Sequence, residues 1–187
     1  MGRWEPDAAG RLRVAAMELY SERGYDRTTV ADIADRAGVT ARTFFRHFAD
    51  KREVLFAGSE ALQEHMVEAL MAAPPTATPM EAVAAAALSS ADFFDDLRRD
   101  YPARRQAVIT ATPELREREL IKMAALTTAF TDALRHRGVG PDVAALAAET
   151  GVAVFRVAFE RWLAGPDGVK LADVIRSTLT TLSGLTA

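Results

Sequence analysis

Cationic and aromatic side chains are interleaved in the stretch TARTFFRHFADKR, residues 40–52. Between residues 36 and 52, five arginines and lysines stand against one aspartate, so this segment carries +4 in a chain whose net charge is −3. Cationic side chains bind phosphates, and a guanidinium can also bind two acceptors of a guanine at once. The segment therefore indicates a nucleic-acid contact, and a solvated helical face is the alternative explanation of such a charge run.

A short helix would divide these side chains between two faces. Thr40 can cap such a helix, which we expect to extend through about Phe48. Helical spacing places an apolar set on one face, where it can pack against the preceding helices. The apolar set is Ala41, Phe44, Phe45 and Phe48, and the opposite set is Arg42, Thr43, Arg46 and His47.

Another short helix precedes this one. Thr29 can cap it, with Asp32 three residues later, and Ile33 and Ala34 belong to an apolar stripe of helical period. The two helices are joined by AGVT, in which Gly38 adopts a left-handed turn at little cost. Two short helices joined by a tight turn predict a helix-turn-helix, whose second helix enters the major groove of DNA.

The remaining chain predicts an all-α protein of about nine helices. Its 187 residues are 49% hydrophobic and 26% charged, a balance typical of a globular protein with a sizeable core. Prolines at 74, 75 and 79 interrupt the helical pattern and predict a helix-turn-helix domain at 8–68 and a helical body at 69–187. We expect helices near residues 8–23, 30–37, 40–48, 50–71, 79–98, 101–110, 112–137, 141–164 and 169–183.

Several classes of protein are disfavoured by composition. Cysteine is absent, which excludes disulfides and thiolate chemistry, and the three histidines are not paired at metal-ligand spacing. No phosphate-binding glycine loop or recognisable nucleophile–base pair is present, so we expect no enzymatic activity, no catalytic residue, no metal and no cofactor. No apolar run approaches the roughly 20 residues of a membrane span, and we expect a cytoplasmic protein without a membrane partner.

The stretch TTVADIADRAGVTARTFFRHFADKREVLF, residues 28–56, resembles the DNA-binding segment of the tetracycline-repressor (TetR) family of bacterial regulators. The family pattern is met at Ile-Ala (33–34), Ala-Gly-Val-Thr (37–40), Thr-Phe-Phe (43–45), His-Phe (47–48) and Lys51. The resemblance implies a homodimeric, ligand-responsive repressor that is released from a palindromic double-stranded DNA operator by an unidentified small-molecule effector. The alternative is a helical ligand-binding or interaction protein without regulatory DNA binding.

Roles for the individual residues follow from the motif. Arg42, in the first turn, is suited to a guanine, whereas Arg46 and His47 are suited to phosphates. Lys51 would support a phosphate at the start of the fourth helix, which we expect to begin at Asp50 and to connect the DNA-binding domain with the body. A solvated Arg42 and a core His47 are the alternatives. The expected DNA-binding residues are Thr29, Thr40, Ala41, Arg42, Thr43, Phe45, Arg46, His47 and Lys51.

Phe45 departs from the family pattern. The family usually has a tyrosine here, and its hydroxyl commonly donates to a phosphate, which phenylalanine cannot do. We expect the missing hydrogen bond to reduce DNA affinity by about 0.5–1.5 kcal/mol for each DNA-binding domain.

The body should contain an effector site and a dimer interface. Arg156 lies in the apolar run VAVFRVAF and should be buried, paired either with Glu160 or Glu149 or with an anionic effector. The expected effector-binding residues are Met66, Phe93, Phe94, Met123, Phe130, Phe155, Arg156 and Phe159. The resemblance implies that the last two helices pair with a second subunit through Val143, Leu146, Val154, Val157, Leu171, Val174, Ile175, Leu179 and Leu182.

Overall fold

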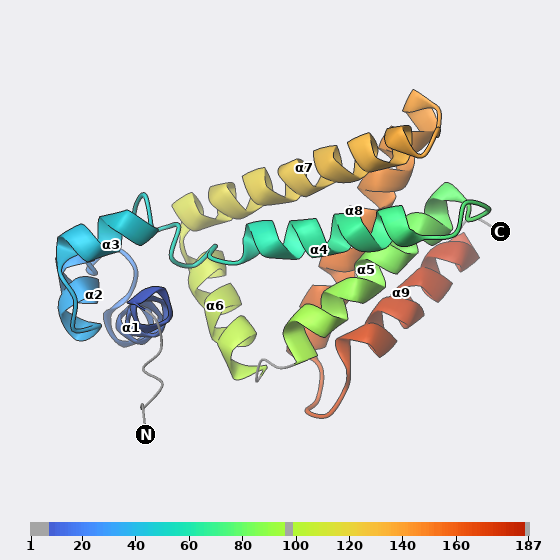
Figure 1. Cartoon of the computed structure of the whole chain (residues 1–187). Coiled ribbons are helices and arrows are strands. Elements are labelled where there is room, and N and C mark those ends of the chain that lie inside the picture. Colours follow the sequence, from blue (N-terminus) through green and yellow to red (C-terminus); the bar gives the residue numbers. More distant parts are fainter. Residues whose placement is uncertain (1–7, 96–98, 186–187) are drawn as a thin grey trace, which may run out of the picture. The chain divides into compact units, whose positions relative to one another are not determined.

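The computed structural model describes residues 8–95 and 99–185, and this part of the chain contains helices and no strand (Figure 1). The all-α prediction is confirmed, and the described ranges contain nine helices at about the expected positions. The last residues of the expected helix at 79–98 lie outside the described residues. The helices are α1 (Ala8–Arg23), α2 (Val30–Arg36), α3 (Ala41–His47), α4 (Ser59–Ala72), α5 (Pro79–Asp95), α6 (Asp100–Ala111), α7 (Pro113–His136), α8 (Pro141–Ala164) and α9 (Leu171–Leu185).

The expected start of the fourth helix is wrong. Residues 51–58 form a series of turns, and α4 begins only at Ser59. The carboxylate of Asp50 accepts hydrogen bonds from the backbone N–H groups of Arg52 (2.8 Å) and Glu53 (3.2 Å), which caps a tight turn in place of a long helix. Gly58 then adopts a positive φ of 92°, a conformation that interrupts a right-handed helix.

Contacts divide the described chain into two compact units. The head unit comprises residues 8–58 and 103–119, so it contains α1, α2 and α3 together with most of α6 and the first turns of α7. The body unit comprises residues 59–95, 99–102 and 120–185. The predicted domain boundary between residues 68 and 69 stays a prediction, because contact density and independent folding are different properties.

The head unit is built on a small apolar core. Leu12 of α1, Ile33 of α2 and Phe44 of α3 are each fully buried. Tyr20 is also buried and donates its hydroxyl to the backbone carbonyl of Lys51 (2.7 Å), which fastens α1 to the segment after α3. Burial raises the pKa of the Tyr20 phenol, so this donor keeps its proton at physiological pH.

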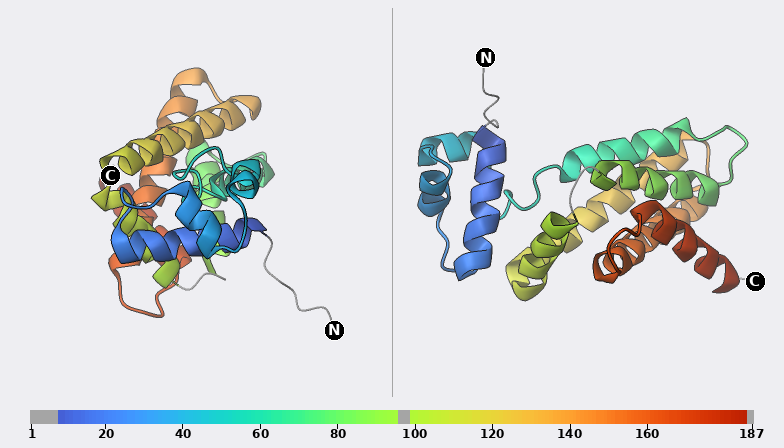
Figure 2. Two further views of the ribbon diagram at one scale, coloured as in Figure 1. Left: turned by 90° about the vertical axis from the view of Figure 1, so that its left-hand side faces the viewer. Right: turned by 90° about the horizontal axis from the view of Figure 1, so that it is seen from below.

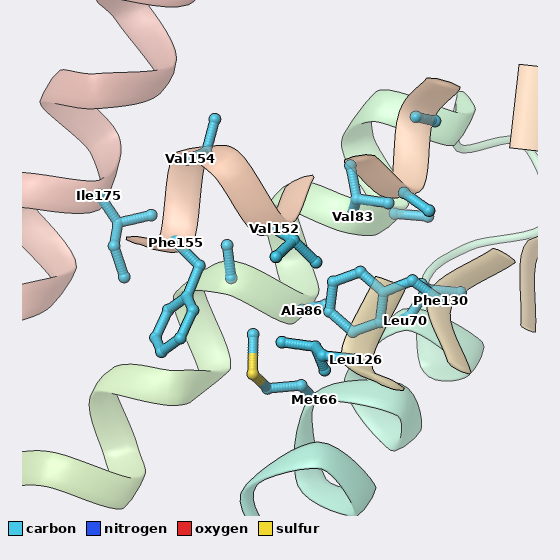
Figure 3. Close-up of a cluster of buried hydrophobic side chains, with 14 of the residues drawn as sticks. Met66, Leu70, Val83, Ala86, Leu126, Phe130, Val152, Val154, Phe155 and Ile175 are labelled. Atoms are coloured by element: carbon cyan, nitrogen blue, oxygen red, sulfur yellow. The ribbon is translucent and has the colours of Figure 1, made fainter. Parts of the chain in front are cut away.

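The body unit has a larger core between α4, α5, α7, α8 and α9. In Figure 3, Met66 of α4, Leu126 and Phe130 of α7, and Val152 of α8 converge in this core. The α4 and α5 helices lie side by side as an antiparallel pair, and α5 also contacts α8 and α9 (Figures 1 and 2). Among the described residues, no helix has both the length and the apolarity that a membrane crossing requires.

Candidate nucleic-acid interface

The α3 helix has one buried face and one exposed face. Phe44 is fully buried and Phe48 nearly so, whereas Arg42, Arg46 and His47 are exposed. The prediction that the cations project away from the core is confirmed. In the part of the chain that the structure describes, no hydrogen bond or ion pair holds the Arg42 guanidinium. This arginine is therefore available to a partner.

The placement of Phe45 and Ala41 on the buried face is wrong. Phe45 is 58% exposed, and Ala41 is exposed as well. Successive residues of a helix differ by about 100°, so the core that covers Phe44 does not reach its neighbour. The two phenyl rings meet nearly edge to face, with centroids 5.5 Å apart and planes at 81°. The buried ring thereby helps to fix the direction of the exposed one.

Threonine caps hold both helices of the motif. The Thr40 hydroxyl accepts from the Thr43 backbone N–H (3.1 Å), and the two hydroxyls lie 3.1 Å apart. Gly38 makes the preceding turn with a φ of 67°, as its position in the sequence predicts. Since both hydroxyls already interact with each other, the first contribution of Thr40 and Thr43 is to fix the start of α3.

Thr29 and Asp32 form a reciprocal capping box at the start of α2. The Thr29 hydroxyl accepts from the Asp32 backbone N–H, and the Asp32 carboxylate accepts from both the hydroxyl (2.6 Å) and the backbone N–H (2.8 Å) of Thr29. Arg23 adds an ion pair at 2.7 Å. These contacts lower the pKa of Asp32 to about 2. The hydrogen bond from the Thr29 hydroxyl contributes most, followed by the bond from the Thr29 N–H and by the interaction with Arg23. The predicted capping arrangement is confirmed.

Lys51 does not occupy a helix N-terminus, so the helix-based argument for phosphate binding at this residue is wrong. Its ammonium donates to the backbone carbonyls of Tyr25 (3.0 Å) and Thr28 (3.1 Å), and it lies 4.1 Å from the centroid of the Tyr25 ring. These contacts connect the segment after α3 with the loop before α2. Lys51 therefore braces the head unit, and a phosphate contact at this position stays a prediction.

Arginines of α6 and α7 hold the turns that follow α3. Arg105 donates to the backbone carbonyl of Leu55 (2.7 Å), and its guanidinium lies 5.1 Å from the centroid of the Phe56 ring. Arg118 pairs with Glu53 at 2.6 Å. These partners are 50 and 65 residues apart in the chain, so no local spacing pattern indicated them. Neither contact was predicted from the sequence.

Aromatic candidates in the body lie in one cluster. The ring centroids of Phe94 and Phe159 are 5.0 Å apart, and those of Phe155 and Phe159 are 5.8 Å apart. Phe93 contacts Phe94, and Trp162, which was not predicted, lies 5.6 Å from Phe159. Helical spacing from Phe155 and Phe159 could have indicated Trp162, because the three share one face of α8.

The remaining effector candidates separate by burial. Met66 and Phe130 are fully buried in the body core, and Met123 is half-buried against it. Arg156 is exposed and lies 3.4 Å from Glu160, so the expected burial of this arginine is wrong. The predicted pairing with Glu160 is present, but on the solvent side of α8. Its exposure also removes the reason for placing an anionic effector beside it.

The nine apolar residues expected at a dimer interface also separate into two groups. Val154, Leu171 and Ile175 are buried in the core of their own chain, and Val174, Leu179 and Leu182 pack against it. The three that stay exposed all lie on α8, and Leu146 is the most exposed of them at 71%. These three residues are Val143, Leu146 and Val157.

Within the residues that the structure describes, no group of three or more histidine or acidic side chains is placed to hold a metal ion. The chemically distinctive surface of the head is therefore the cationic face of α3, supported by two capped helices and by Phe44 and Phe48. This arrangement is a helix-turn-helix.

Two family models cover most of the chain. The model described as bacterial regulatory proteins of the tetR family matches residues 12–57, and the model described as the MftR C-terminal domain matches residues 77–186. The second match alone spans more than half of the chain. The chain belongs to the TetR family of bacterial transcriptional regulators.

Two relatives match part of this chain. The HTH-type transcriptional regulator TcmR of Streptomyces glaucescens is 42% identical over 71 residues, which are 38% of this chain and 31% of TcmR. The HTH-type transcriptional activator FasR of Mycolicibacterium smegmatis is 33% identical over 91 residues, which are 49% of this chain and 41% of FasR. This chain thus matches less than half the length of either regulator.

A solved structure extends the similarity to the whole fold. Thermus thermophilus FadR, a TetR-family transcriptional repressor solved in complex with lauroyl-CoA, superposes with a TM-score of 0.56 at 25% identity. The superposition covers 93% of this chain and 92% of FadR.

Proposed function

We propose that this protein is a cytoplasmic, homodimeric transcriptional repressor that binds a palindromic DNA operator and is released by a small-molecule effector. The observation that carries the DNA-binding part is the exposed cationic face of α3 above buried Phe44 and Phe48. Arg42 would bind a base edge in the major groove, while Arg46 and His47 would contact phosphates. The match of the head to the tetR family model supports this assignment.

The exposed face of α8 supports a homodimer. Val143, Leu146 and Val157 leave apolar surface in water along one side of this helix. Because a two-fold dimer buries the same patch of both subunits, two copies of α8 could cover each other's exposed side chains. This pairing would also supply two recognition helices for a palindromic operator.

Substitution of an α8 side chain tests the dimer. We expect Leu146→Asp to shift the protein toward monomer in light scattering at micromolar concentration, because it places a charge in the apolar contact. Ala145→Asp adds the same charge at an exposed position of the same helix, beside Asp142 and Glu149, and should leave the dimer intact. Equal behaviour of the two variants would contradict pairing through this face.

The body supports an apolar effector. The half-buried side chains of Phe93, Phe94, Phe159 and Met123 combine apolar surface with partial access. Lauroyl-CoA is the ligand named for the T. thermophilus relative, which makes a fatty acyl-CoA the first effector to test. Such a ligand would have to bind the DNA-free conformation more tightly than the DNA-bound one, since only differential affinity shifts the equilibrium.

Coupling between effector and DNA would act on the turns at residues 51–58. Arg105 of α6 and Arg118 of α7 hold this segment, and both helices continue from the head unit into the body unit. A rearrangement of α6 or α7 in the body would therefore be transmitted to the segment that follows the recognition helix.

DNA binding is tested by selecting bound fragments from genomic DNA and measuring their affinity by fluorescence anisotropy. We expect affinity to fall steeply as salt rises, through release of counterions. Arg42→Ala should relax the preference at one base pair of each half-site by about 1–3 kcal/mol. Uniform weakening across all sequences would instead place Arg42 on a phosphate.

Arg36→Ala is the matched control on the same head. The Arg36 guanidinium is held by Glu18 (3.2 Å) and Glu22 (2.9 Å), so its removal should leave the base preference unchanged. A protein that binds no fragment in a salt-dependent way would favour the alternative function, a helical ligand-binding or interaction protein. Addition of lauroyl-CoA to the bound complex tests the effector, and release of DNA is the expected result.

A further inference from the structure

We propose that Phe45, together with Ala41, reads the C5-methyl group of a thymine in the major groove of the operator, a role that rests on the proposed DNA-binding function. Ala41 and Phe45 are four residues apart, so they are neighbours on one side of α3. Both are exposed, and exposed Arg42 and Arg46 follow them directly in the sequence. The recognition helix thus presents an apolar strip beside its cations.

The exposure of Phe45 is exceptional for this protein. Among the described phenylalanine, tyrosine and tryptophan side chains, it is the one that the fold leaves exposed, and the other phenylalanines are buried or half-buried. Its edge-to-face contact with fully buried Phe44 limits the directions that the ring can take. An apolar ring held in water on a DNA-facing surface gains stability when a partner covers it.

The chemistry of the ring selects the partner. Phenylalanine has no hydroxyl, so it cannot donate a hydrogen bond to a phosphate oxygen. In the major groove, thymine is distinguished by its methyl group, and apolar side chains such as alanine and phenylalanine contact that methyl. A cytosine offers an amino donor at this edge, which a phenyl ring leaves without a strong acceptor. The apolar strip therefore favours thymine over cytosine.

Replacement of thymine by deoxyuridine tests the inference, because this change removes the methyl group alone. We would substitute each thymine of one operator half-site in turn and measure binding at fixed salt by fluorescence anisotropy. For the unaltered protein, one position should lose about fourfold in affinity, the value of one buried methyl-sized group. With Phe45→Ala the same substitution should cost clearly less than fourfold, because most of the contact is already lost and only Ala41 remains beside the methyl group.

Two further variants sharpen the result. Phe45→Leu keeps an apolar side chain and should retain part of the dependence on the methyl group. Phe45→Tyr adds a hydroxyl and should keep the dependence of DNA affinity on the thymine methyl group. It should bind DNA more tightly only if a phosphate lies within reach of the hydroxyl. Thermal unfolding followed by circular dichroism checks each variant, and the exposure of this position predicts little change.

The outcomes separate this inference from the proposed function. If the unaltered protein binds an operator but Phe45→Ala shows the same deoxyuridine profile, the thymine contact is overturned while DNA binding stands. Uniform weakening by Phe45→Ala, with no position-specific change, would place the ring against the sugar-phosphate backbone and also overturn it. Absence of any salt-dependent DNA binding would overturn both proposals together.

Discussion

The head unit and the body unit are held together by different kinds of interaction. In the head, a small apolar core is supplemented by polar contacts between distant segments, as in Arg118 with Glu53, Arg105 with the Leu55 carbonyl and Lys51 with the Tyr25 carbonyl. In the body, the corresponding contacts are largely apolar and join five helices in one core. The polar contacts of the body include Arg99 and Arg137, which donate to carbonyls at the ends of other helices.

This difference follows from the size of each unit and from the surface it must expose. One face of α3 stays exposed with Arg42, Arg46 and His47, so this helix contributes only Phe44 to the head core, together with Phe48 just after it. Ion pairs between partly exposed groups contribute little stability each and weaken with salt. The head is therefore the more adjustable unit, and the body should carry most of the free energy of unfolding.

The largest expected effect is in the body core. Phe130 is fully buried, so Phe130→Ala should reduce the free energy of unfolding by about 3–5 kcal/mol through lost burial and a residual cavity. Phe45→Ala removes the same ring from an exposed position and should change it by less than about 0.5 kcal/mol. Urea unfolding measures both variants. Similar losses would contradict the placement of the two rings.

A glycine in α8 should be the next most sensitive site. A Cβ at Gly151 would lie 2.8 Å from the Cβ of Val83 on α5, too close for two carbon atoms. Overpacking costs about 1–3 kcal/mol, which should exceed the roughly 1 kcal/mol that alanine gains in helix propensity. We expect Gly151→Ala to lower the melting temperature.

Gly184 supplies the control for that substitution. It also lies in a helix of the body, but a Cβ there would meet no atom within 4 Å. Gly184→Ala should be neutral or slightly stabilising in the same thermal unfolding experiment. A stabilising Gly151→Ala would mean that α5 and α8 can separate more easily than their close packing indicates.

The polar contacts of the head should show a smaller, salt-dependent effect. Arg118→Gln removes the ion pair with Glu53. The Arg118 side chain is 30% exposed and the Glu53 side chain is 24% exposed. Because both groups are still partly in water, we expect a loss of about 0.5–1.5 kcal/mol at low salt and less at high salt. A double-mutant cycle with Glu53→Gln isolates the pair.

Glu160→Gln is the matched control, since it breaks the exposed pair between Arg156 and Glu160 in the body. This pair should contribute almost nothing to the free energy of unfolding. If the coupling between Arg118 and Glu53 were as small, the role of this pair in holding the turns after α3 would be lost.

The smallest expected effect is acid sensitivity at the start of α2. The folded protein holds the pKa of Asp32 at about 2, below its ordinary value of 3.8. The carboxylate therefore stabilises the head fully above about pH 4, and this contribution is lost as the pH falls toward 2. Asp32→Asn should remove that part of the acid dependence in circular dichroism.

Asp35→Asn, on the same helix, is the charge-matched control.

The body contains a comparable capping box at Thr78 and Glu81, where the Thr78 backbone N–H and hydroxyl lower the pKa of Glu81. The capping box of Thr29 and Asp32 in the head also includes an ion pair with Arg23. An NMR titration that places the Asp32 pKa near its ordinary value would contradict the described capping box.

Local features of the fold could be predicted because their causes lie within a few residues. The caps at Thr29 and Thr40, the glycine turn between them and the helical apolar periods depend on hydrogen bonds and side-chain spacing over one or two turns. The series of turns at 51–58 was missed because Asp50 can cap either a turn or a long helix. The packing of distant segments against residues 51–58 decides between a turn and a long helix.

By itself, the sequence determined the helical elements, the helix-turn-helix and the separation of Phe44 and Phe48 from Arg42 and Arg46. Tertiary structure alone decided that Phe45 is exposed, that Arg156 faces solvent and that Lys51 donates to carbonyls. The physical reason is that helical spacing determines which side chains share a face, whereas only the packing of distant segments determines where a core ends. A residue at the edge of an apolar face is buried or exposed according to what that packing brings beside it.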